Sequence, residues 1–184
     1  MNIRQIYIFF CTLCLCYLFL LFLTPVAIAH WPPWITEHWS ISLLFKLVSL
    51  YGDLACHQRP ERSFFIHGVQ MALCVRCLGI TIGFCIATLV SVKIVPFGEF
   101  YTAMKKMFFL DERTELYTLF AIIFLFVAPM AFDGGIQLIT NYDSPVHMRM
   151  ITGILYGYAE GSACIAFISQ HRSPRRAVQY FVGT

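Results

Sequence analysis

Three cysteines and a histidine follow a pattern that could hold a metal ion. Cys74 and Cys77 form a C-x-x-C pair, and Cys56-His57 lies upstream of it. A C-x-x-C pair at the start of a helix puts two sulfurs on one face, and the upstream pair can fold back beside them. Three thiols and an imidazole bind zinc tetrahedrally, and thiolates also suit iron. We therefore predict a metal site with zinc or iron as its cofactor, formed by Cys56, His57, Cys74 and Cys77.

The same thiols allow a second chemistry. The C-x-x-C spacing lowers the pKa of a thiol, which can then cycle through a disulfide, and the nearby Arg76 would assist a thiolate. A static disulfide or unreacted thiols are the third interpretation. An oxidising compartment would favour a disulfide and a reducing one a metal, so the residues alone leave all three open.

A second group of polar residues falls at the predicted ends of apolar segments: Arg62, Arg76, Asp133, Gln137 and Arg149. Ionisable groups near lipid are costly, so we expect them to face the protein interior and to pair, Asp133 with Arg149 or Arg76. Asp133 and Gln137 lie one helical turn apart on one face. The cluster would either lock helices together or bind an anionic group such as a lipid headgroup, which suits the bidentate geometry of arginine.

Glu160 is an isolated carboxyl within an apolar segment. Such a group is either a proton carrier or the partner of another polar residue. The remaining cysteines lie inside apolar segments and need no role beyond that of small apolar side chains.

Composition indicates which elements must position these residues. The chain has 184 residues, 59% hydrophobic and 12% charged, whereas a soluble domain is about a quarter charged. The apolar residues lie in long blocks. We predict an all-α fold, a polytopic membrane helix bundle that forms a single membrane domain over residues 1–184.

Four blocks are long enough to cross a bilayer: residues 6–28, 75–95, 116–140 and 150–168. The first is expected to be an uncleaved N-terminal anchor, although its end also resembles a signal-peptidase site. The last three form a motif-bearing core over residues 56–170. Gly79, Gly83 and Ala87 in one span, and a second glycine ladder in the last, predict close helix packing.

Residues 41–55 are short for a span and place Ser42, Lys46, Ser49 and Asp53 on one helical face. This pattern predicts an amphipathic helix, interfacial or re-entrant. Five spans are the alternative. The four-span topology collects most Lys and Arg residues on the side of both termini, so the positive-inside rule puts the termini in the cytoplasm. In either topology the start of the span at 75–95, the end of the span at 116–140 and the start of the span at 150–168 lie on one side of the membrane. These ends carry the polar motifs.

Several motifs occur in an order that resembles a known family. They are Cys56-His57-Gln58, Arg62-Ser63-Phe64, Leu73 to Ile80, Asp133-Gly134 with Gln137, and Arg149 with Thr152-Gly153. They resemble a prokaryotic membrane protein family catalogued as domain of unknown function 2085, over about residues 50–165. The resemblance implies a prokaryotic cell membrane and no particular reaction.

The favoured function is thus a membrane protein with a Cys/His metal or redox site beside a charged cluster. A small transporter or lipid-handling protein is one alternative, and a non-catalytic assembly factor of a membrane complex is another. Whether the chain is an enzyme stays open. Membrane lipids are the expected partners, with other membrane proteins or a second copy as further candidates. A nucleic-acid partner is not expected, because no basic stretch alternates with aromatics.

Overall fold

The computed structural model describes residues 2–56, 58–96, 98–140 and 142–171. Helices dominate, and one short hairpin lies between the third and fourth α-helices. The elements are α1 (Ile3–His30), α2 (Pro33–Thr36), α3 (Trp39–Ala55), the 3₁₀ turn η1 (Pro60–Arg62), β1 (Ser63–Ile66), β2 (Val69–Cys74), α4 (Val75–Ile94), α5 (Phe100–Met107), α6 (Leu116–Ile139) and α7 (Val146–His171).

Among the described residues, four helices are long and apolar enough to cross a membrane: α1, α4, α6 and α7. They contain 28, 20, 24 and 26 residues, and about 20 are needed for a helix to span the hydrocarbon core. α3 has 17 residues, and its apolar part is limited to Trp39–Leu50. The prediction of four spans plus one shorter helix is therefore confirmed.

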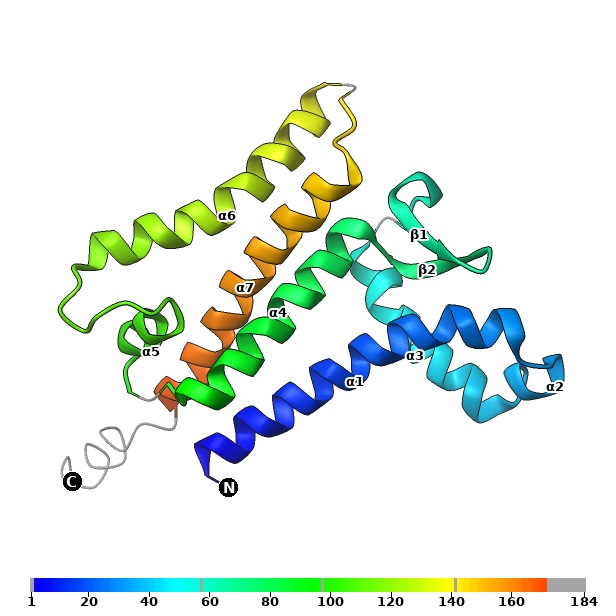
Figure 1. Cartoon of the computed structure of the whole chain (residues 1–184), viewed down its shortest axis with the longest axis horizontal. Coiled ribbons are helices and arrows are strands. Elements are labelled where there is room, and N and C mark those ends of the chain that lie inside the picture. Colours follow the sequence, from blue (N-terminus) through cyan, green and yellow to red (C-terminus); the bar gives the residue numbers. More distant parts are fainter. Residues whose placement is uncertain (1, 57, 97, 141, 172–184) are drawn as a thin grey trace.

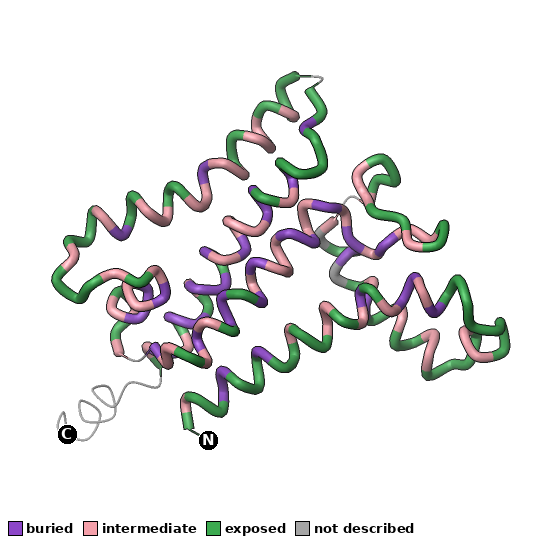
Figure 2. The backbone as a smooth tube through the Cα atoms, viewed as in Figure 1, coloured by how far each residue is buried: buried purple, intermediate pink, exposed green. Residues whose placement is uncertain are grey.

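The spanning helices lie side by side in the order α1, α4, α7, α6 (Figure 1). They form an open row rather than a closed four-helix bundle. α4 and α7 are the central pair, and buried residues concentrate where these two helices face each other (Figure 2). The outer helix α6 has only 11% of its apolar window buried, so most of its surface is left for lipid.

Small residues allow the backbones of α4 and α7 to approach closely, as the two ladders predict. A Cβ atom added to Gly79 would lie 2.6 Å from the carbonyl oxygen of Met150, and one added to Gly153 would lie 2.5 Å from that of Arg76. Gly83 and Gly157 are still tighter against the facing backbone. Without a hydrophobic force between helices in lipid, this close packing is what joins them.

α3 folds back against α1 beside the hairpin, with the Tyr17 hydroxyl donating to the carbonyl oxygen of Val48 at 3.2 Å. Its leucines are exposed along one face, at positions 43, 47, 50 and 54. This spacing gives one continuous apolar stripe. Such a stripe fits a helix that lies on the membrane with its leucines toward lipid.

A two-stranded antiparallel hairpin was not predicted from the sequence. β1 and β2 pair through Phe65 with Gln70 and Ile66 with Val69, and the ladder is irregular between Ser63 and Phe65. The connection is His67-Gly68, both with positive φ (50° and 80°). Positive φ at both central positions is the conformation of a type I′ turn, a common two-residue hairpin loop, and glycine adopts it without strain. The hairpin ends at Cys74 and so delivers that residue to the start of α4.

Candidate metal centre

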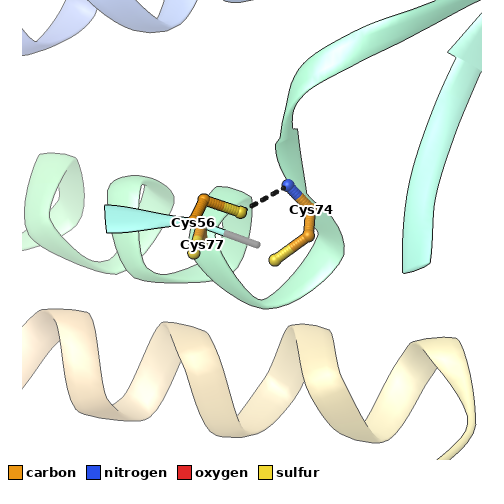
Figure 3. Close-up of side chains that lie close together, drawn as sticks. All are labelled: Cys56, Cys74 and Cys77. Atoms are coloured by element: carbon orange, nitrogen blue, oxygen red, sulfur yellow. Dashed lines mark hydrogen bonds between the residues drawn. The ribbon is translucent and has the colours of Figure 1, made fainter. Parts of the chain in front are cut away.

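The thiols of Cys56, Cys74 and Cys77 converge although they come from different elements. Cys56 follows α3, Cys74 ends β2, and Cys77 lies in the first turn of α4. Their sulfur atoms all lie within 4.8 Å of one another (Figure 3). The Cys74 backbone N–H donates to the Cys56 sulfur at 3.3 Å. The structure thus brings together the three cysteines that the sequence selected.

A buried apolar cluster holds these three positions in place. Leu21 of α1, Val48 of α3, Met71 and Leu73 of β2 and Leu78 of α4 pack together, and all are 2% exposed or less. Cys56 and Cys77 pack against this cluster. Alternation along β2 puts Met71 and Leu73 into the core, so Cys74 falls on the opposite side.

The surroundings of Cys56 favour its thiolate form. Hydrogen bonds with the thiols of Cys74 and Cys77 hold the pKa of the Cys56 thiol well below its usual value, against the opposing effect of burial. Cys74 also stands at the N-terminus of α4, where the helix dipole favours negative charge. Thiolates are the form that binds metals.

The sulfur spacing fits a tetrahedral metal. Zinc–sulfur bonds are about 2.3 Å long, which sets adjacent sulfurs about 3.8 Å apart. Small side-chain movements from the present spacing would reach that geometry. The predicted fourth ligand, His57, lies outside the described residues and stays a prediction.

Asp133 pairs with Arg76, one of its two predicted partners, and not with Arg149. The two side chains form an ion pair between α6 and α4, with 11% and 21% of their surfaces exposed. Gln137, one turn along α6, donates to both oxygens of Asp133 at 3.2 Å. The predicted joint surface of Asp133 and Gln137 is therefore present.

Arg149 pairs with a different carboxylate, one the sequence did not select. It is 3% exposed and binds Asp143, while its Nε donates to Ser144 at 3.1 Å. Arg62 reaches the same Asp143 at 2.8 Å and also donates to Gln137 at 3.3 Å. Gln137 in turn donates to Ser144 at 2.6 Å. All five predicted polar residues thus belong to one connected network.

The cysteines and the network meet at a cavity of about 270 Å³. Its lining includes the three cysteines, Gln58, Gln137 and four arginines, namely Arg59, Arg62, Arg76 and Arg149. Arg59 was not selected from the sequence. Its position between Cys56-His57 and Arg62 could have pointed to a role at this site.

Glu160 lies away from this cavity. It lines a separate apolar cavity of about 360 Å³ with Cys14 of α1 and Cys85 of α4. The proton-carrier role of Glu160 stays a prediction.

These features define an integral membrane protein with a half-buried cluster of three thiols. The chain belongs to the family of predicted membrane proteins described as DUF2085, whose profile matches residues 56–163. This is the family that the motifs resemble. The matched range contains every described residue of the cysteine site and the polar network, whereas α1 and α3 lie outside it.

Two archaeal relatives are similar to this chain. The uncharacterized protein MJ1492 of Methanocaldococcus jannaschii is 37% identical over 144 residues, which cover 76% of this chain and 81% of the relative. An uncharacterized protein of Methanothermobacter thermautotrophicus is 32% identical over 120 residues, covering 63% and 87%. No solved structure matches the chain.

Proposed function

We propose that this protein is a membrane-embedded metal protein that holds zinc, or alternatively iron, through the thiolates of Cys56, Cys74 and Cys77. The observation that carries the proposal is the convergence of three sulfurs within 4.8 Å from three separate elements. A disulfide needs two sulfurs, whereas three thiolates are a ligand set for a soft metal.

The cavity beside the sulfurs supports a centre with an accessible metal. Zinc sites with three protein ligands and one open position are typical of catalysis, and four protein ligands are typical of structural sites. If His57 binds the metal, the centre has four protein ligands, as structural zinc sites do. If it does not, the fourth position would open toward the arginines that line the cavity.

Topology favours thiol redox chemistry as a second candidate. By their order in the sequence, eight Lys and Arg residues fall on the side of the termini and five on the side of the cysteines. The eight are Arg4, Lys93, Lys105, Lys106, Arg113, Arg172, Arg175 and Arg176, and the five are Lys46, Arg59, Arg62, Arg76 and Arg149. By the positive-inside rule the side of the termini is cytoplasmic, which puts the cysteines at the outer face of a cell membrane. Disulfides persist there.

Metal content tests the proposal. The chain is purified in detergent without chelators, and bound metal and free thiols are measured for the parent, a Cys74→Ser, Cys77→Ser double variant and a Cys16→Ser control. Cys16 is an exposed cysteine of α1, away from the site. We expect about one zinc or iron per chain in the parent and the control, and loss of that metal in the double variant.

A parent without metal, in which two thiols react only after a reductant is added, would overturn the metal centre in favour of the redox candidate. Size-exclusion profiles of all variants separate loss of metal from loss of fold. A His57→Gln variant in the same series measures whether the histidine contributes.

A further inference from the structure

We infer that the cavity beside the cysteines binds a phosphate group, either free or as the headgroup of a lipid. Four arginines line this cavity, and its described lining contains no acidic side chain. Arginine matches phosphate through two parallel hydrogen bonds. The inference goes beyond the metal centre, because it assigns a ligand class to the arginines and not to the sulfurs.

The arginines outnumber the carboxylates that neutralise them. Asp133 pairs with Arg76, and Asp143 is shared by Arg62 and Arg149. Within the part of the chain that the structure describes, Arg59 has no side-chain partner. Four positive charges against two negative ones leave an excess of two.

Neither the metal nor the other nearby acids remove this excess. A divalent metal on three thiolates carries one net negative charge, so the cavity stays positive. Two further carboxylates are exposed to solvent. Asp53 accepts a hydrogen bond from Gln58 at 3.0 Å, and Glu61 lies in the groove outside the cavity.

One of the arginines that line the cavity has a donor without an acceptor. The Nε atom of Arg76 is buried and, among the described residues, unpartnered, although the same guanidinium pairs with Asp133 through Nη2. A buried donor without a partner is unfavourable. A small shift of the Arg76 side chain toward an anion in the cavity would give this donor an acceptor.

The cavity adjoins an outer groove. Arg59, Arg62 and Gln137 line both the cavity and this groove, whose volume is about 630 Å³. The inner cavity is somewhat smaller than sites for drug-sized molecules, which run about 300–1,000 Å³. This size suits a phosphate group whose attached portion lies in the groove or among the lipids.

The test uses two phosphate sources and two matched variants. The full chain is held in dodecyl maltoside, which contains no phosphate, and binding of inorganic phosphate and of phosphatidic acid is measured by calorimetry. Arg59→Gln removes the unpaired charge without breaking an ion pair among the described residues. Arg113→Gln removes an exposed charge in the loop between α5 and α6 and is the control.

We expect the parent and Arg113→Gln to bind equally and Arg59→Gln to bind about tenfold more weakly, because a hydrogen bond to a charged group contributes about that factor. Arg76→Lys, which keeps a positive charge beside Asp133, should also weaken binding about tenfold. Binding of both ligands would identify the phosphate group itself, and binding of phosphatidic acid alone would identify a lipid headgroup.

No binding of either ligand, or an equal loss in Arg59→Gln and Arg113→Gln, would overturn the inference. Metal is measured in the same samples. If the chain binds phosphate but carries no metal, the anion site is supported and the proposed metal centre fails. If the chain carries metal but binds no phosphate, the metal centre is supported and the anion site fails.

Discussion

At the scale of single residues, burial decides which charged pairs matter. Arg149 is 3% exposed at the start of α7, and its counterion Asp143 lies in the preceding loop. The sequence indicated that Arg149 must be paired, because an unpaired buried charge is costly. It did not indicate Asp143, since the path of the chain between α6 and α7 determines which carboxylate comes within reach.

Replacement of Asp143 by Asn should destabilise the protein by about 2 kcal/mol, because Arg149 then keeps its buried charge without a full counterion. The matched control is Glu112→Gln, which breaks the 3.5 Å pair with Lys106, a cation whose side chain is 36% exposed against 4% for Arg149. Exposed pairs contribute less than about 1 kcal/mol.

Thermal unfolding of both variants in detergent checks this expectation. The midpoint should fall by several degrees for Asp143→Asn and by much less for Glu112→Gln. Equal shifts of the midpoint would contradict this expectation. They would mean that the ion pair of the buried Arg149 contributes no more to stability than the more exposed pair of Lys106 and Glu112.

The cysteine site shows what spacing can and cannot predict. The C-x-x-C pair and Cys56 were identified as one cluster from their order in the chain, and their sulfurs do converge. The sequence places Arg59 beside the selected residues. That Arg59 lines the cavity, and that the Nε of Arg76 is unpartnered among the described residues, depends on how the 3₁₀ turn and α4 are placed.

At the scale of elements, long apolar segments were predictable and the hairpin was not. The bounds of α4 and α6 differ from the expected 75–95 and 116–140 by one residue each. No helix or strand was predicted for residues 63–74. The signal available was His67-Gly68 between two apolar runs, a dipeptide suited to a two-residue hairpin loop.

The glycine ladders yield a prediction at this scale. A Gly157→Ala variant should be destabilised by about 1–3 kcal/mol, because the added methyl group has to push α7 away from the Ile80 backbone of α4. Gly135→Ala is the control, since nothing lies within 4 Å of a Cβ atom there. Alanine at that helical position should be neutral or slightly stabilising.

Unfolding midpoints measure the difference between the two glycine variants. A large loss for Gly157→Ala with none for Gly135→Ala is the expected result. If the two variants behaved alike, close contact between α4 and α7 would not be what joins the central pair of helices.

At the scale of the whole molecule, the row of helices separates two ends with different character. The N-terminus, the α5–α6 loop and the end of α7 lie together, and the cysteines with the polar network lie at the other end (Figure 1). Alternation of the spans predicted this grouping. Charge asymmetry then predicts that the cysteine end faces outward.

Single cysteines introduced at exposed positions test the orientation. We expect Glu61→Cys to react with a membrane-impermeant maleimide in intact cells, and Glu112→Cys to react only after permeabilisation, with labelled sites identified by mass spectrometry. Glu61 lies at the site end and Glu112 in the α5–α6 loop. The reverse pattern would put the cysteine site in the cytoplasm.

X-ray absorption at the metal K edge of the purified chain tests directly whether the three sulfurs bind one metal. For zinc, we expect three sulfur neighbours at about 2.3 Å and one lighter neighbour at about 2.0 Å. These sulfur neighbours should disappear in the Cys74→Ser, Cys77→Ser variant. A parent that carries no metal, or a metal surrounded only by nitrogen and oxygen, would contradict the proposed metal centre.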